Sequence, residues 1–71
     1  MKETIGKTAG KIWRALIHKE EISISQLPRI VKEKAVIVYQ ALGWLAREDK
    51  IEYHSRGRRT SVSLTDAERN K

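Results

Sequence analysis

Hydrophobic residues recur at helical spacing in three stretches of the chain. The first covers residues 3–19, where apolar positions return every three or four residues and basic side chains lie opposite them. The second begins after Ser25, a residue type that favours helix N-termini, and the third covers residues 35–48. The spacing predicts three helices, and in the second it directs three side chains inward: Leu27, Ile30 and Val31.

Alternation of apolar and polar residues marks the predicted strands. Ile22 and Ile24 alternate with serines, and residues 51–55 and 60–64 alternate on either side of an arginine-rich turn. The order is therefore helix, short strand, helix, polar turn at 32–34, helix and hairpin. This order predicts an α+β winged helix-turn-helix with three helices, a short first strand and a C-terminal two-stranded wing.

We assign residues 1–65 to this domain and expect residues 66–71 to form a flexible C-terminal tail. Thr65 and Glu68 have the spacing of a helix capping box. Very little chain follows Thr65, however, and isolated short helices are marginal in water. We therefore expect frayed backbone from about Asp66 onward.

The chain has 71 residues, 39% hydrophobic and 34% charged, as expected for one small folded domain. A domain of this size offers at most a shallow cleft, so we do not expect an enzyme. Cysteine is absent, which excludes disulfides and cysteine-bound zinc and makes a reducing, intracellular setting the default. No apolar run approaches the roughly 18 residues of a membrane span. We expect a cytoplasmic protein.

No motif supplies a convincing catalytic, cofactor or metal site. The segment GKTAGK at residues 6–11 suggests a phosphate-binding loop, but its glycines are one residue too close and no strand precedes it. Ile12 also stands where that motif requires Ser or Thr. His18 and His54 lack companion ligands. The carboxylate pairs Glu20–Glu21 and Glu48–Asp49 lie at element ends, where solvated carboxylates are ordinary, and no nucleophile accompanies them. We expect no cofactor, no metal and no small-molecule ligand.

The charge balance favours a polyanionic partner. Fifteen Lys and Arg residues against nine Asp and Glu residues give a net charge of +6. Each phosphate that a cation neutralises releases counterions and strengthens binding. Charge alone is weak evidence, because many small basic proteins bind nothing specific.

Two segments resemble a known family. AGKIW in the first predicted helix and ALGWLAREDKIEY at residues 41–53 resemble a small, functionally uncharacterised winged helix-turn-helix family of bacteria and archaea. The likeness extends over nearly the whole chain up to Leu64, and its most specific part is GWLAREDKI at residues 43–51. The resemblance implies a prokaryotic protein with this fold. It implies function weakly, because winged helices also serve as protein-binding and dimerisation modules.

Three arginines at the predicted wing tip can support no core. In DNA-binding members of this fold class the wing meets the phosphate backbone or an adjacent minor groove. The alternative is that Gly57 makes the turn and the arginines keep a sheet edge soluble. The third helix adds a sparse reading surface, in which Gln40 suits adenine and Arg47 suits phosphate or guanine. The candidate DNA-binding residues are Lys32, Lys34, Val36, Gln40, Arg47, Arg56, Arg58 and Arg59.

Apolar side chains beyond the inner stripes of two helices indicate a second surface. In the first helix they follow two glycines spaced four apart, and in the third they lie beside the core stripe. They are either ordinary core, with the glycines accommodating the third helix, or a partner surface. Because a domain this small gains from dimerising, we assign six residues to a homodimer interface: Gly6, Gly10, Trp13, Ile17, Ile37 and Trp44.

The sequence thus predicts a homodimeric protein that binds double-stranded DNA, as a small transcriptional regulator or chromatin-associated factor. The alternative is a winged helix used for protein–protein interaction or dimerisation without DNA binding.

Overall fold

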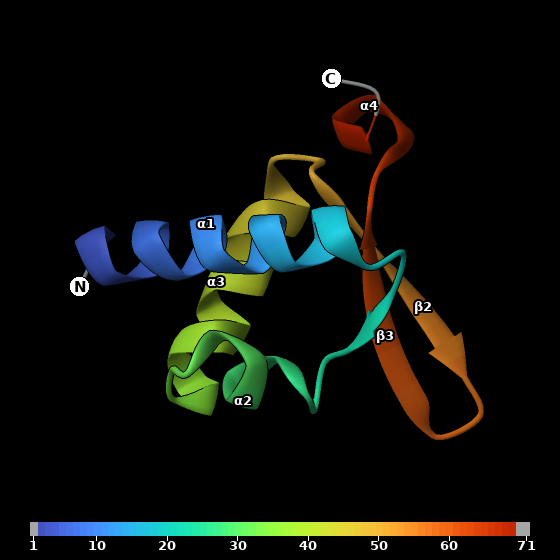
Figure 1. Cartoon of the computed structure of the whole chain (residues 1–71), viewed down its shortest axis with the longest axis horizontal. Helices are drawn as coiled ribbons and strands as arrows, with labels where there is room; N and C mark the ends of the chain where they lie inside the picture. The colour runs from blue at the N-terminus through green and yellow to red at the C-terminus, as the bar shows by residue number, and fades with distance from the viewer. Residues whose placement is uncertain (1, 70–71) are drawn as a thin grey trace.

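The fold, described for residues 2–69 by a computed structural model, is the predicted winged helix-turn-helix. Residues 2–69 form four helices and three strands, and Figure 1 shows how they are arranged. Every predicted helix and strand is found within a residue or two of its expected bounds. The elements are α1 (Lys2–His18), β1 (Ile22–Ser23), α2 (Leu27–Val31), α3 (Ala35–Arg47), β2 (Ile51–Arg56), β3 (Arg59–Leu64) and α4 (Asp66–Arg69).

The three strands form an antiparallel sheet in the order β1-β3-β2. Val62 of the central strand pairs with Ile22 on one side and with Tyr53 on the other. Because side chains alternate across a strand, the residues in register with Val62 share its face of the sheet, which is the face with the buried residues Ile22 and Val62. Gly57 closes the β2–β3 hairpin with a positive φ of 63°, a conformation that favours glycine.

The core lies between the helices and this face of the sheet. α1 packs against α3 and α2, and α3 also contacts β2. The inward stripes of α1 and α3 supply most of the buried side chains, which is the reason that the sequence is periodic there. Wholly buried side chains include Ile12, Leu16, Leu27, Val38 and Val62. No helix in the described part of the chain is long and apolar enough to span a membrane.

Two local expectations about α2 were wrong. Ser25 does not cap this helix, because Gln26 occupies the N-cap position and the Ser25 hydroxyl instead lies 3.0 Å from that of Ser23. Ile30 is 40% exposed, whereas it was expected to point inward. The helix has five residues, and Leu27 and Val31, one turn apart, already fill its inner side.

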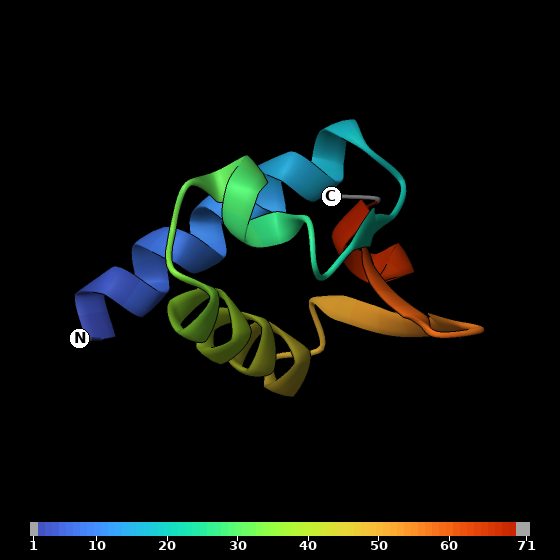
Figure 2. The same ribbon diagram turned by 90° about the horizontal axis from the view of Figure 1, so that it is seen from below.

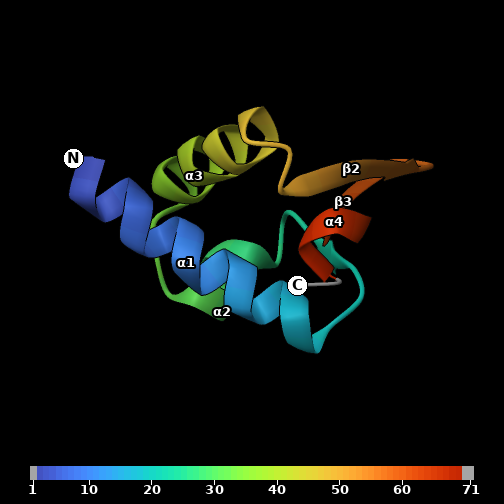
Figure 3. The ribbon, with the colours of Figure 1, turned by 90° about the horizontal axis from the view of Figure 1, so that it is seen from above.

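The end of the chain also differs from the frayed backbone that we expected from Asp66. Residues 66–69 form α4, which lies beside the C-terminal end of α1 and the base of the hairpin (Figure 3). The Thr65 hydroxyl donates a hydrogen bond to the Asp49 carbonyl, and the Arg69 guanidinium donates one to the Glu20 carbonyl. These tertiary contacts stabilise a turn too short to persist alone. The rest of the expected tail, 70–71, lies outside the described residues.

Candidate nucleic-acid interface

The outward side of α3 is a row of exposed residues opposite its core stripe. Val36, Gln40, Gly43 and Arg47 are all exposed and follow one another at intervals of three or four residues. This spacing places them on one face of the helix. Tyr39, on the flank of this row, is 49% exposed. The structure therefore places the three residues predicted to contact DNA from α3 together on one accessible surface.

The turn before α3 adds positive charge at the start of that helix. Lys32 ends α2 in a left-handed conformation, with φ 58°, and Lys34 is the extended N-cap residue of α3. Both side chains are exposed. Glu33 between them accepts a hydrogen bond of 2.9 Å from Lys11 of α1. The acidic residue of this turn is thus paired with α1, and the two lysines are left at the surface.

The wing carries its three arginines, all of them exposed, around its turn. α3 and the β2–β3 hairpin occupy one side of the molecule, with α1 and α2 on the other (Figure 2). Arg58 and Arg59 lie in or beside the hairpin turn. α3 leads into β2 through a short connection, so the start of the hairpin lies next to the end of α3 and the wing tip lies at its far end.

Arg56 differs from its two neighbours, because its guanidinium bonds a carboxylate. Its Nη2 lies 3.1 Å from Oε1 of Glu21, and the other carboxylate oxygen of Glu21 accepts a 2.5 Å hydrogen bond from Ser61. The bond from Ser61 lowers the pKa of Glu21 below its ordinary value, and the charge of Arg56 lowers it further, while partial desolvation opposes both. Glu21 thus links the strand β3 to the last residue of β2.

Sequence reasoning missed the role of Glu21, which it treated as an ordinary solvated carboxylate at an element end. Glu21 immediately precedes β1, and β1 pairs with β3 through Ser23 and Ser61. The contact therefore depends on a pairing between segments about 40 residues apart. The alternation of Ile22 with serines showed a strand, but it did not show which strand would be its neighbour.

Tyr53 is a second residue that sequence reasoning did not assign to the site. It lies on β2 opposite Val62, on the sheet face that covers the core, yet it is 48% exposed. Partial burial raises the pKa of Tyr53 above its ordinary value. It adds an amphipathic side chain to the wing.

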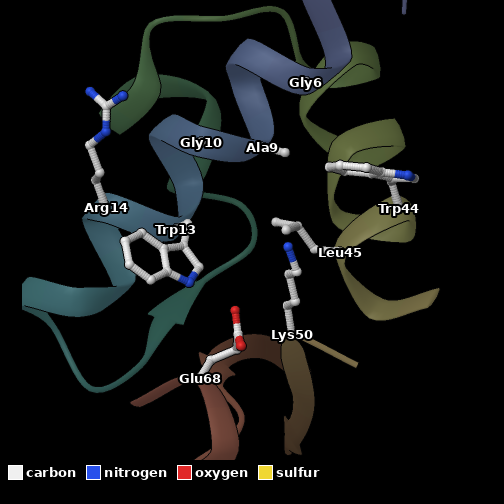
Figure 4. Close-up of a pocket in the computed structure, with 9 residues that line it drawn as sticks. All are labelled: Gly6, Ala9, Gly10, Trp13, Arg14, Trp44, Leu45, Lys50 and Glu68. Atoms are coloured by element: carbon white, nitrogen blue, oxygen red, sulfur yellow. The ribbon is translucent and has the colours of Figure 1, made fainter. Parts of the chain in front are cut away.

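A second surface lies between α1 and α3. A hollow of about 400 Å³ has Trp13 of α1 on one side and Trp44 of α3 on the other (Figure 4). The Lys50 ammonium lies 6.0 Å from the centre of the Trp44 ring, within the range of a cation–π contact. A smaller hollow adjoins this one, with Trp13 and Glu68 lining both, and continues to Ile17.

Five of the six residues predicted for a homodimer interface line these two hollows, and Ile37 lies half-buried elsewhere on α3. Trp44 is 43% exposed, whereas Trp13 packs partly against the core. A Cβ atom added at Gly6 or Gly10 would meet no heavy atom within 4 Å, apart from its own helix backbone and chain neighbours. The interpretation that these glycines make room for α3 within the chain is therefore wrong.

The fold and these surfaces can be set beside known proteins. The model of a family of winged helix-turn-helix domains, DUF2582, matches residues 1–64. The chain belongs to this family. The match ends where β3 ends, so α4 follows the part of this DUF2582 protein that the family model describes.

Relatives of this DUF2582 protein occur in archaea and bacteria. The uncharacterised protein MJ1608 of Methanocaldococcus jannaschii is 50% identical over 50 residues, which cover 66% of this chain and 70% of that protein. The solution structure of BT2368 from Bacteroides thetaiotaomicron is 35% identical, with a TM-score of 0.79 over 89% of this chain and 77% of the other.

A more distant structure shares the fold. MepR of Staphylococcus aureus, a transcription regulator of the multidrug efflux pump MepA, is 19% identical, with a TM-score of 0.70. The likeness covers 94% of this chain but 49% of MepR, so this chain spans about half the length of that regulator. At this identity the likeness concerns the fold alone.

Proposed function

We propose that this DUF2582 protein binds duplex DNA, with α3 in the major groove and the wing on the neighbouring backbone. The observation that carries the proposal is the exposure of the outward row of α3, the two turn lysines and the wing arginines, together with the position of α3 and the hairpin on one side of the molecule (Figure 2). A helix of this kind fits the major groove of B-form DNA, and a net charge of +6 favours association with phosphate.

The residues of this surface divide into two roles. Gln40 can pair with adenine, Arg47 with guanine or phosphate, and Val36 can contact a thymine methyl group. The proposed phosphate contacts come from the turn before α3 and from the wing, and such contacts set position rather than sequence preference. They are Lys32, Lys34, Arg56, Arg58 and Arg59. Few of the exposed α3 side chains read bases, so we expect modest sequence specificity from a single copy.

The comparisons support a regulatory role for DNA binding. MepR, which has the same fold, is named as a transcription regulator. We therefore propose that the present protein acts as a small transcriptional regulator or a chromatin-associated factor in the cytoplasm. This role rests on the exposed surface described above, because a shared fold alone does not determine function.

We further propose that two copies pair through the hollow between α1 and α3. Trp44 exposes a large apolar surface there, and Gly6 and Gly10 leave the α1 backbone open to close approach. Pairing would present two α3 helices to successive half-sites, which would compensate for the sparse reading surface of each. The same hollow is the specific observation that favours the second candidate function, a protein-interaction module that does not bind DNA.

Duplex binding measured against salt concentration tests the proposal. Fluorescence anisotropy of a labelled duplex of about 20 base pairs, two helical turns, should show saturable binding that weakens steeply with salt. If the turn lysines, Arg47 and the wing each contact one phosphate, the logarithm of the binding constant should fall by about 0.9 per contact per decade of salt. Absence of binding at low salt would contradict the DNA-binding proposal and leave the protein-interaction module.

A further inference from the structure

Gly43 lies inside α3, in the centre of its outward row. It is the ninth residue of a 13-residue helix, with Gln40 one turn before it and Arg47 one turn after it. A glycine in a helix interior is less favourable than alanine, because the glycine backbone loses more conformational freedom when the helix forms. Glycine at this position therefore lowers the stability of α3. If the fold itself requires the glycine, the structure should show a backbone conformation or a close contact that excludes a larger residue.

The described part of the chain contains no such reason. Gly57 is the glycine with a positive φ in residues 2–69, so Gly43 does not require a conformation that other residues avoid. A Cβ atom added at Gly43 would meet no heavy atom within 4 Å, apart from its own helix backbone and chain neighbours. Neither backbone geometry nor packing within the chain explains the glycine.

The surroundings of Gly43 give the outward row a notch. Tyr39 and Gln40 on one side, and Trp44 and Arg47 on the other, are larger side chains that are also exposed. Between them the main chain of α3 is uncovered. A partner that touches both Gln40 and Arg47 must pass over this notch, because the two residues lie about 10 Å apart along the helix axis at 1.5 Å per residue.

We infer that Gly43 is the point at which the α3 main chain comes into van der Waals contact with duplex DNA. The inference rests on the proposed function and adds a positioning residue to it. The contacting group would be an edge of the groove, either a sugar–phosphate ridge or the outer edge of a base. Without a Cβ atom the helix can lie deeper, so that the short side chain of Gln40 reaches a base edge.

The test is the variant Gly43→Ala, measured for both stability and DNA affinity. In the free protein the added methyl group enters open space and favours helix, so the melting temperature should rise by about 2–8 °C for a domain of this size. On DNA the same methyl group is inserted into a close contact, so affinity should fall roughly tenfold or more. A change that stabilises the free protein and weakens the complex is not expected from a purely structural role.

Thr4→Ala is the control. Thr4 is exposed on α1 and lines neither hollow, and alanine has a higher helix propensity than threonine, so this variant also stabilises a helix. We expect a rise in melting temperature and unchanged affinity for the same duplex.

The outcomes separate the inference from the proposed function. If wild-type protein does not bind duplex DNA, the proposed function fails. If wild-type protein binds and Gly43→Ala binds equally well, the function stands and the role of Gly43 is overturned. A lower melting temperature for Gly43→Ala would also overturn it, because the glycine would then have an internal reason. Higher stability with weaker binding, while Thr4→Ala keeps its affinity, is the expected result.

Discussion

The two surfaces that meet on α3 differ in chemistry and are suited to different partners. The outward row, with Gln40 and Arg47, is exposed and follows a turn with two exposed lysines. The flank toward α1 has Trp44 and the glycines of α1 around a hollow. One helix thus offers a cationic side and an apolar side about a quarter turn apart. Substitutions on one side should leave the function of the other unchanged, and this separation can be tested.

The largest expected effect concerns the cationic side. The double variant Arg58→Ala, Arg59→Ala should weaken duplex binding and flatten its log–log salt dependence by about two units, at about 0.9 per lost phosphate contact. Arg56→Ala in addition should change the slope less than either of these, because Glu21 already pairs with this guanidinium. Anisotropy titrations over a range of salt concentrations measure the slope.

The control for the wing variants removes the same charge elsewhere. Lys7 and Lys19 are exposed on and just after α1, so Lys7→Ala, Lys19→Ala should leave the slope nearly unchanged. Equal slopes for wild type and the wing variants, with folding intact, would exclude the wing from the DNA surface.

A slightly smaller effect is expected on the apolar side. Trp44→Ala should weaken dimerisation by about 2 kcal/mol, or about thirtyfold, because a tryptophan at an interface commonly dominates its energy. Tyr39→Ala is a matched comparison, since Tyr39 is similarly exposed on the other flank of α3. Sedimentation at micromolar concentrations should show dimers for Tyr39→Ala and monomers for Trp44→Ala. A wild-type protein that remains monomeric as it is concentrated would refute the pairing.

The smallest expected effect lies where the wing meets β1. Glu21 holds Arg56, so Glu21→Gln should free this guanidinium for phosphate and steepen the salt slope by up to about 0.9. Glu20→Gln makes the same change in net charge one residue away and should have little effect, because the contact of Glu20 with Arg69 uses its main-chain carbonyl. Identical slopes for the two variants would show that Glu21 does not restrain Arg56.

The contribution of Glu21 to the stability of the folded protein depends on pH, and the direction of the dependence follows from its pKa. The pKa of Glu21 is lowered in the folded protein relative to its ordinary value of 4.5. As the pH falls, Glu21 is therefore protonated first in the unfolded chain. The stabilisation by ionised Glu21 is fully present above the ordinary pKa of 4.5 and is lost as the pH falls through the lower pKa of the folded protein. Urea unfolding at neutral and acid pH should thus show a smaller loss of stability for Glu21→Gln than for wild type.

The helical and hairpin elements could be predicted because their signals are local. Alternation around Gly57 and the period of α1 and α3 specify which face of each element is apolar, and the structure has these elements within a residue or two of the expected bounds. The cap of α2 was wrong, because Gln26 follows Ser25 directly and either residue could begin a helix there. The position of Ile30 was also wrong, since five residues do not form a full amphipathic surface.

The contacts that could not be predicted are those between segments distant in sequence. The bond of Glu21 with Arg56 requires β1 to pair with β3, and the turn at α4 depends on the bond between Arg69 and Glu20. Periodicity contains no information on either. The exposure of Gln40 and Arg47 did follow from the helical period, but their role in binding remains a prediction that calls for measurement.

The most direct test of the central claim is to map where DNA touches the protein. Isotope-labelled protein titrated with a duplex of about 20 base pairs should show backbone amide shift changes on the outward row of α3, in the turn at Lys32 and Lys34, and at the wing tip around Arg58. The amides of Gly6 and Ile17 on α1 should change little between the DNA-free and DNA-bound dimer. Changes confined to the hollow between α1 and α3, or none at all at low salt, would contradict the account.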